Sequence, residues 1–110
     1  MLNTDILPIN FTLADAARDE IIRLMGIPHE RLGLPALPSI SWAVDLYEDG
    51  TQREGPAIGF YDAATAKDMR DSVQIVNGVE VVYFVTESTS RHFYRRTLDF
   101  AADRGFFLRS

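Results

Sequence analysis

The chain has 110 residues, a formal net charge of −5 and no cysteine, and 46% of its residues are hydrophobic. We expect one domain over residues 1–110, since single domains cluster at this length. The missing cysteine excludes thiol nucleophiles, disulfides and thiolate-held metal centres, and the negative charge argues against a nucleic-acid binder, whose affinity comes largely from Lys and Arg.

The first predicted element is an amphipathic helix over residues 13–25. Thr12 is a candidate N-cap, and Asp15 three residues later completes a capping-box-like pattern. Gly26 is typical of the position just after a helix. The apolar stripe of this helix consists of Ala17, Ile21, Leu24 and Met25.

A hairpin is predicted next. Residues 40–47 alternate between apolar and polar, which is typical of a half-buried strand. Residues 48–51 read as a turn, the polar stretch through Gly55 is expected to be mobile, and residues 57–61 are the partner strand. The apolar face of the first strand carries Ile40, Trp42, Val44 and Leu46.

Residues 62–71 are alanine-rich and predict a short helix or turn. A second hairpin follows, because Asn77-Gly78 suits the positive φ values of a type I′ turn. Its strands are residues 72–76 and 79–85. The second of these is nearly all apolar, so we expect it to be a central strand.

The C-terminal region predicts a helix and a last strand. Ser88, Thr89 and Ser90 are candidate caps for a helix that runs through Arg96 or further, and Gly105 could end it. Residues 106–108 are a candidate short strand. The predicted class is therefore α+β, mostly β, with an N-terminal amphipathic helix and a C-terminal helix.

The same region carries the candidate binding site. Residues 1–90 have 6 basic and 14 acidic side chains, net −8, whereas residues 91–110 have 5 basic and 2 acidic side chains, net +3. A helix starting near Ser90 would offer free N–H groups and hydroxyls to an anion, with Arg91 and Arg95 on one face and His92 between them. The alternative is an amphipathic segment that buries Phe93 and Leu98 and leaves its arginines in water.

We expect no catalytic residue, metal or cofactor, and hence no enzyme. The sequence has no nucleophile motif, phosphate loop or histidine pair at metal-ligand spacing. His29 and His92 could share a metal with a carboxylate only if the fold brought them together. No apolar run approaches the roughly 18–20 residues that span a bilayer, and the first ten residues lack a basic signal region, so the expected location is cytoplasmic, without membrane contact.

Four stretches resemble the A-type iron–sulfur carriers, the HesB-like family. Phe11-Thr12-Leu13-Ala14-Asp15-Ala16-Ala17 resembles the family's opening, in which a strand enters an "L-T-x-x-A" helix. Gly78-Val79-Glu80-Val81-Val82 resembles its "G-V-x-V-x-V" strand. Leu98-Asp99-Phe100 resembles the "L-D-[YF]" strand, and Gly105-Phe106-Phe107-Leu108 the "G-F-x-[FI]" ending. In outline the resemblance covers most of residues 11–108.

The resemblance implies a small, strand-rich HesB-like domain that self-associates as a homodimer and has a protein partner in iron–sulfur assembly. Family carriers use one cysteine after the first strand and a C-x-C pair at the C-terminus, whereas the first region here reads Leu37-Pro38-Ser39-Ile40-Ser41. No ligand role can therefore be carried over. The expected function is a non-catalytic accessory or interaction role without a cluster; the alternative is a small anion- or small-molecule-binding module that uses residues 88–96.

Overall fold

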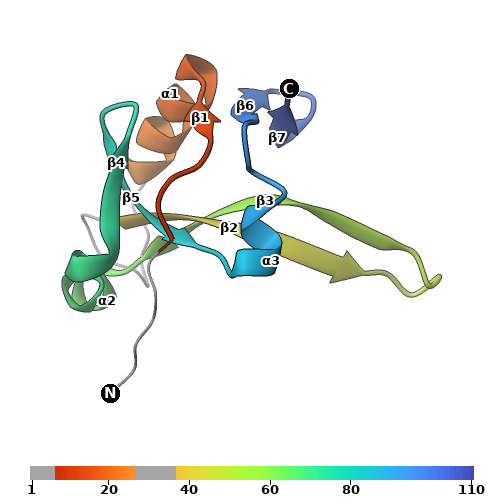
Figure 1. Ribbon diagram of the computed structural model, residues 1–110, viewed down its shortest axis with the longest axis horizontal. Helices are drawn as coiled ribbons and strands as arrows, with labels where there is room; N and C mark the ends of the chain where they lie inside the picture. The colour runs from red at the N-terminus through yellow and green to blue at the C-terminus, as the bar shows by residue number, and fades with distance from the viewer. Residues whose placement is uncertain (1–6, 27–36) are drawn as a thin grey trace.

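Two β-sheets and an N-terminal helix meet around one buried cluster (Figure 1). The computed structural model describes residues 7–26 and 37–110. Seven strands in these ranges form sheets of order β1-β6-β7 and β3-β2-β5-β4, so the predicted strand-rich α+β class is confirmed. The elements are β1 (Thr12–Leu13), α1 (Asp15–Met25), β2 (Leu37–Leu46), β3 (Gln52–Tyr61), α2 (Ala63–Asp68), a 3-10 turn (Arg70–Ser72), β4 (Val73–Val76), β5 (Val79–Phe84), α3 (Glu87–Ser90), β6 (Thr97–Ala101) and β7 (Gly105–Arg109).

The N-terminal helix is present, but its start differs from the prediction. Thr12 lies in β1, where it pairs in parallel with Thr97, so it is not the N-cap. The N-cap is Ala14, which makes no side-chain cap bond. Gly26 closes the helix at a φ of −80°, so the left-handed conformation that glycine allows is not used there. Because Thr12 pairs with a distant strand, it does not act as the helix cap that the local sequence favours.

The β2–β3 hairpin is longer than predicted. Its antiparallel register is unbroken from Leu37 opposite Tyr61 to Leu46 opposite Gln52. The predicted turn is confirmed, with the Asp49 carboxylate accepting from the backbone N–H and the hydroxyl of Thr51 at 2.9 and 2.6 Å. The partner strand begins at Gln52 and not at residue 57 as predicted, because ladder hydrogen bonds depend on the backbone and not on side-chain polarity. The mobility of the stretch through Gly55 stays a prediction.

The second hairpin matches the prediction. Asn77 and Gly78 have φ values of +48° and +78°, the positive region that a type I′ turn requires. β5 lies between β2 and β4, so it is a central strand as expected. The predicted short helix after β3 is α2, which begins after an Asp62 cap whose carboxylate accepts from the Thr65 N–H at 2.7 Å.

The predicted C-terminal helix through Arg96 is wrong. α3 is a single turn that ends at Ser90, and its cap is Thr86, which exchanges capping-box bonds with Thr89. Arg95 has a φ of +57°, which is incompatible with a continuing helix. The chain then forms the β6–β7 hairpin, and the short strand predicted at 106–108 is confirmed within β7.

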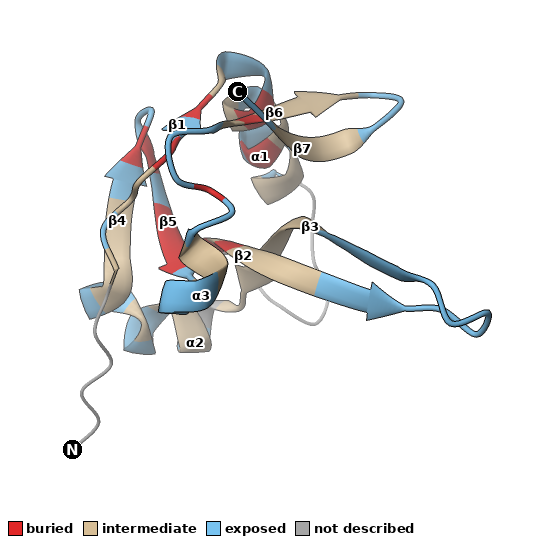
Figure 2. Cartoon of the chain, turned by 45° about the vertical axis from the view of Figure 1, so that its right-hand side comes forward, coloured by how far each residue is buried: buried red, intermediate tan, exposed pale blue. Residues whose placement is uncertain are grey.

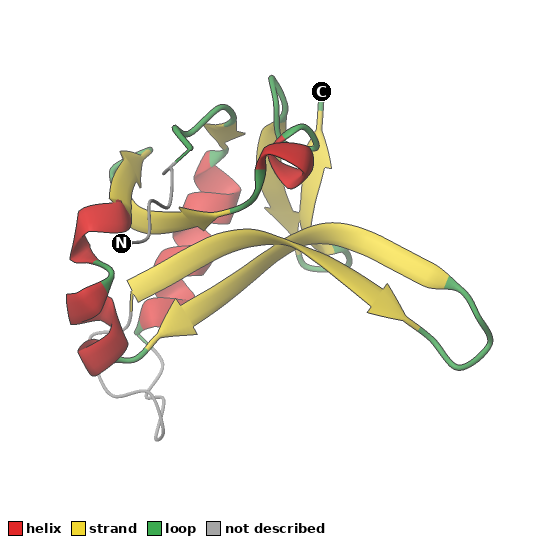
Figure 3. Cartoon of the chain, turned by 60° about the horizontal axis from the view of Figure 1, so that its bottom comes forward, coloured by secondary structure: helices red, strands yellow, loops and turns green. Residues whose placement is uncertain are grey.

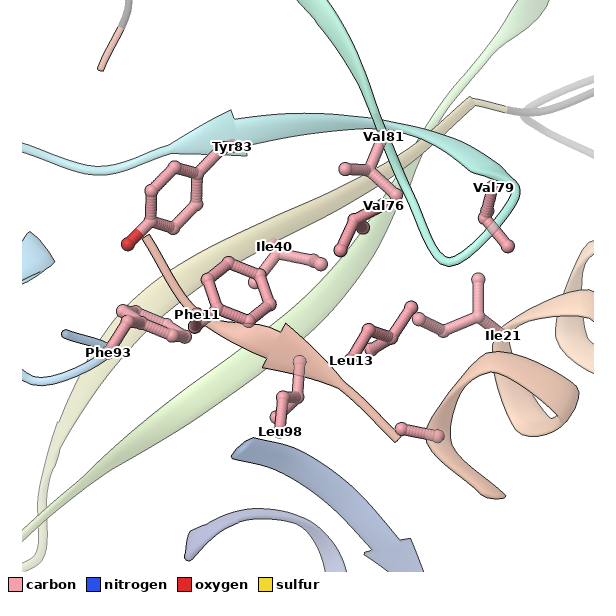
Figure 4. Close-up of a cluster of buried hydrophobic side chains, with 11 residues drawn as sticks. Phe11, Leu13, Ile21, Ile40, Val76, Val79, Val81, Tyr83, Phe93 and Leu98 are labelled. Atoms are coloured by element: carbon pink, nitrogen blue, oxygen red, sulfur yellow. The ribbon is translucent and has the colours of Figure 1, made fainter. Parts of the chain in front are cut away.

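A single core joins the two sheets to α1. Figure 2 shows that buried residues gather on β5, α1 and the facing part of β2, whereas the far end of the β2–β3 hairpin is exposed. Figure 4 shows the side chains of this cluster: Phe11, Leu13, Ala17, Ile21, Ile40, Val76, Val79, Val81, Tyr83, Phe93 and Leu98.

Side chains of the β4–β5 hairpin hold the N-terminal segment against this core. The Gln74 amide accepts from the Ile9 N–H and donates to the Leu7 carbonyl, at 3.0 and 2.9 Å. The Asn77 amide donates to the Leu13 carbonyl and to the Asp15 carboxylate, both at 2.9 Å. These bonds fix the segment that carries β1 into the other sheet.

Candidate functional site

The turn after α3, residues 91–96, carries most of the predicted site and is called the basic turn below. Its backbone is already hydrogen-bonded: the N–H groups of His92, Phe93 and Arg96 donate to carbonyls three residues earlier, at 3.0–3.1 Å. The Arg95 N–H donates to the Asn10 carbonyl at 3.0 Å. The Ser90 hydroxyl donates to the Glu87 carbonyl at 3.0 Å. These groups are therefore not the free donors that a helix starting near Ser90 would offer, and anion binding by this segment stays a prediction.

The arginine side chains of the basic turn remain available. Arg91 and Arg95 lie beyond the end of α3, so they do not share a helix face as predicted. Both are exposed, and the Arg95 guanidinium lies 5.3 Å from the centre of the Tyr94 ring. Within the described residues, Arg91, Arg95 and Arg96 form no ion pair, whereas Arg23 pairs with a neighbouring glutamate.

Phe93 anchors the basic turn in the core. Its side chain is completely buried, and its ring centre lies 5.2 Å from that of Phe11 and 5.4 Å from that of Tyr83. Leu98 is also completely buried. The alternative reading of this segment, with Phe93 and Leu98 inside and the arginines in water, is therefore the one the structure adopts.

His92 lies flat on Trp42 at the outer margin of the core. Their ring centres are 3.9 Å apart and their planes differ by 3°. The Trp42 indole N–H donates to the Glu54 carboxylate at 3.0 Å. His29 lies outside the described residues, and those residues hold no group of three or more side chains placed to bind a metal. A metal site on these two histidines gains no support.

A partly buried polar network, which the sequence did not indicate, positions the basic turn. The Tyr83 hydroxyl donates to the Asn10 side-chain oxygen at 2.6 Å, and the Asn10 amide donates to the Ser90 carbonyl at 3.1 Å. Burial raises the pKa of Tyr83 well above its usual range. A tyrosine on an apolar strand signals that its hydroxyl needs a partner, but no local pattern identifies a residue 73 positions away.

The region that the resemblance aligns with the first carrier cysteine lies on β2. Ser39 is opposite Gly59 and Ser41 is opposite Ala57 on β3. A Cβ on Gly59 would lie 3.1 Å from the Ser39 hydroxyl oxygen, so the glycine leaves room for that side chain. This position therefore holds a hydroxyl against a small neighbour.

A groove of about 870 Å³ opens at the other end of the β3-β2-β5-β4 sheet. Met25 and Leu37, which lie on either side of the stretch outside the described residues, both line this groove, and we therefore assign it no ligand. Its lining is mainly apolar: Ile22, Met25, Leu37, Pro38, Ala66, Lys67, Arg70, Val73, Ile75, Gly78, Val79 and Glu80.

Comparison with known proteins identifies no family model, curated protein or solved structure that matches the chain. Among the described residues, no helix combines the length and apolar character needed to cross a membrane. The functional argument therefore depends on the chain's own residues and on their placement in the fold.

Proposed function

We propose that the chain is a HesB-like domain that acts by binding other proteins, in an accessory role in iron–sulfur assembly, and that it neither catalyses a reaction nor carries a cluster. One observation supports this most strongly. Each of the four family-like stretches occupies the kind of element that the family pattern gives it: β1 running into α1, then β5, β6 and β7.

The arrangement of these stretches adds support. β1 pairs with β6 and β6 pairs with β7, so three of the four short motifs lie in one sheet. Phe11, Leu13 and Leu98, from the first and third motifs, belong to the same buried cluster as β5. Motifs that are weak one by one therefore form one packed unit, as they would in a shared fold.

The chemistry of the chain favours an interaction role over a carrier role. Iron–sulfur clusters are held by soft thiolates, and hydroxyl groups such as those of Ser39 and Ser41 are poor replacements. Among the described residues, His92 is engaged by its stack on Trp42, and no nucleophile–base pair is formed by the serines around it. Recognition of a protein surface needs none of these groups.

Anaerobic reconstitution with iron and sulfide tests the proposal directly. We expect no stable visible absorption band and no bound iron after desalting, with a cysteine-bearing A-type carrier treated in parallel as the positive control. The accessory role is tested by adding the chain to cluster transfer from a loaded carrier to an apo-acceptor. A changed transfer rate is expected; a stable cluster on this chain, or an unchanged rate at saturating concentration, would contradict the proposal.

A further inference from the structure

The basic turn is a local positive surface on an acidic chain. It has three arginines and no acidic residue, for a net charge of +3, whereas the whole chain has a net charge of −5. All three arginines are exposed, and none of them forms an ion pair within the described residues. Lys67 and Arg70, another exposed basic pair, are each followed by an aspartate. The basic turn therefore keeps a positive charge that no ion pair in the described ranges neutralises.

The backbone of the basic turn is fixed on both sides. Buried Phe93 anchors its middle in the core. The Arg95 N–H donates to the Asn10 carbonyl at 3.0 Å and so holds a residue whose φ is +57°. The Arg96 carbonyl accepts from the Thr12 N–H at 3.0 Å, which ties the end of the turn to β1. A surface whose backbone is already ordered loses little conformational entropy when a partner binds.

An exposed aromatic residue lies among the arginines. Tyr94 is 57% exposed, and the Arg95 guanidinium lies 5.3 Å from the centre of its ring. Figure 3 shows this part of the chain beside the β2–β3 hairpin, where His92 stacks on Trp42. Tyrosine and arginine are among the residues most enriched at the energetically important centres of protein interfaces. The basic turn thus combines positive charge with a ring that a partner can cover.

The surroundings of the basic turn favour a segment with several carboxylates over a small anion. A small anion is best held by converging backbone N–H groups, but those of His92, Phe93 and Arg96 already donate to carbonyls of the chain. The arginine side chains are the remaining donors, and a guanidinium pairs well with a carboxylate. Carboxylates spaced along a short segment can meet more than one of them at a time.

The surroundings also disfavour a nucleic acid. The Glu54 carboxylate accepts from the Trp42 indole N–H at 3.0 Å, so a negative charge borders the ring on which His92 stacks. Residues 1–90 have a net charge of −8. Nucleic-acid affinity depends on many phosphate contacts, and a long phosphate backbone would be repelled where it left the basic turn.

We propose that the basic turn is the docking surface for a short acidic segment of a partner protein. Carboxylates of the segment pair with Arg91, Arg95 and Arg96, and an apolar side chain of the segment covers the ring of Tyr94. This inference rests on the protein-binding role proposed above, but it depends neither on the HesB-like resemblance nor on iron–sulfur assembly.

Fluorescence anisotropy of a labelled peptide with the full chain tests the docking surface. The probe is a short peptide of glutamates around a central leucine, and its control has glutamine in place of every glutamate. We expect saturable binding of the acidic peptide that weakens as salt is raised, because exposed charge pairs are screened. The glutamine peptide should not bind.

Two variants separate the charges from the ring. Arg91→Glu/Arg96→Glu should weaken binding of the acidic peptide at least about tenfold, since like charges then face each other. Lys67→Glu/Arg70→Glu, which makes the same change in total charge elsewhere, should bind as the wild type does. Tyr94→Ala keeps the arginines and should remove only the preference for the leucine-bearing peptide over an all-glutamate one. Circular dichroism verifies that each variant is folded.

The outcomes decide the proposal and the proposed function separately. No binding of the acidic peptide at low salt, or equal binding by the wild type and Arg91→Glu/Arg96→Glu, would overturn the docking surface. Tighter binding of inorganic phosphate or of an oligothymidylate of the same charge would overturn it as well. A changed cluster-transfer rate without peptide binding contradicts only the docking surface, whereas peptide binding with an unchanged rate contradicts only the accessory role.

Discussion

Side chains on one face of strand β2 lie in two very different environments. Ile40 and Leu46 alternate in phase on the same side of the strand, yet Ile40 is completely buried and Leu46 is 75% exposed. The first half of the strand receives β5 and the core cluster, whereas the second half has only β3 beside it. Alternation thus sets the face on which a side chain lies, and the tertiary neighbours decide whether that face is covered.

Trp42 marks the boundary between the two halves. Its ring touches buried Phe93 edge-on at 5.9 Å and exposed His92 face-on at 3.9 Å. On the core side, side chains from six helices and strands and from two loops converge. On the side of the arm, the outer part of the β2–β3 hairpin, contacts are cross-strand pairs such as Arg53 over Tyr47 at 5.6 Å. Stability should therefore be concentrated on one side of Trp42.

The largest effect is expected from a cavity in the core. Phe93→Ala should lower the free energy of unfolding by about 3–5 kcal/mol, because it removes a fully buried ring from three aromatic contacts. Leu46→Ala, the matched change in the arm, should alter it by no more than about 0.5 kcal/mol at monomeric concentration. Urea denaturation followed by circular dichroism measures both. Equal losses would refute the contrast between core and arm.

A smaller, pH-dependent effect is expected at Tyr83. At neutral pH, Tyr83→Phe should cost about 1 kcal/mol, because the Asn10 oxygen loses its donor. Burial holds the pKa of Tyr83 above its ordinary value of 10.0, so the unfolded chain releases this proton first. The stability due to the buried phenol is present below pH 10 and is lost as the pH rises beyond it.

Urea midpoints of the wild type and of Tyr83→Phe at a series of alkaline pH values check this expectation. The difference between the two proteins should shrink above pH 10 and then change sign, since the phenylalanine cannot ionise. Parallel curves over the whole alkaline range would contradict the burial of the hydroxyl.

The smallest effect is expected where His92 stacks on Trp42. His92→Ala should cost about 0.5 kcal/mol, the lower end of the usual worth of an aromatic pair, because His92 is exposed. Since Trp42 is the only tryptophan, its fluorescence emission should shift in the same variant. Arg91→Ala, an exposed neighbour in the same turn, serves as the control and should leave the emission unchanged. An identical spectrum for both variants would exclude the stack in solution.

Elements with local signals were predicted well from the sequence. The apolar stripe of α1, the alternation of β2 and the Asn77-Gly78 turn all act over a few residues, so they can be read without the fold. The sequence pattern alone did not predict strands β1 and β6, because each forms only beside the other. Thr12 pairs with Thr97, and Leu13 pairs with Leu98. The prediction of a C-terminal helix failed for the same reason, because residues 97–101 form a strand beside β1 and β7.

The sequence predicted which residues make up the candidate site but not how they are arranged in space. Residues 88–96 do hold exposed arginines beside a buried phenylalanine, as the charge and apolar pattern indicated, and these arginines have no ion pair within the part of the chain that the structure describes. The helix that was to arrange them is absent beyond Ser90, and the Asn10 bonds that do arrange them come from 80 residues earlier. Contacts between residues so far apart in the chain produce no periodic pattern in the sequence.

The parallel pairing of β1 with β6 also has a consequence for how the chain acquires its structure. Thr12 pairs with Thr97, 85 positions later, and β7 must then flank β6. A ribosome therefore synthesises more than 80 further residues before β1 can find its neighbour, while α1 and the β2–β3 and β4–β5 hairpins can form early from local contacts. Until then β1 lacks its only strand neighbour among the described residues, and Phe11 and Leu13 lack their contacts with Phe93 and Leu98, so this segment completes its packing late and gains from protection by a chaperone.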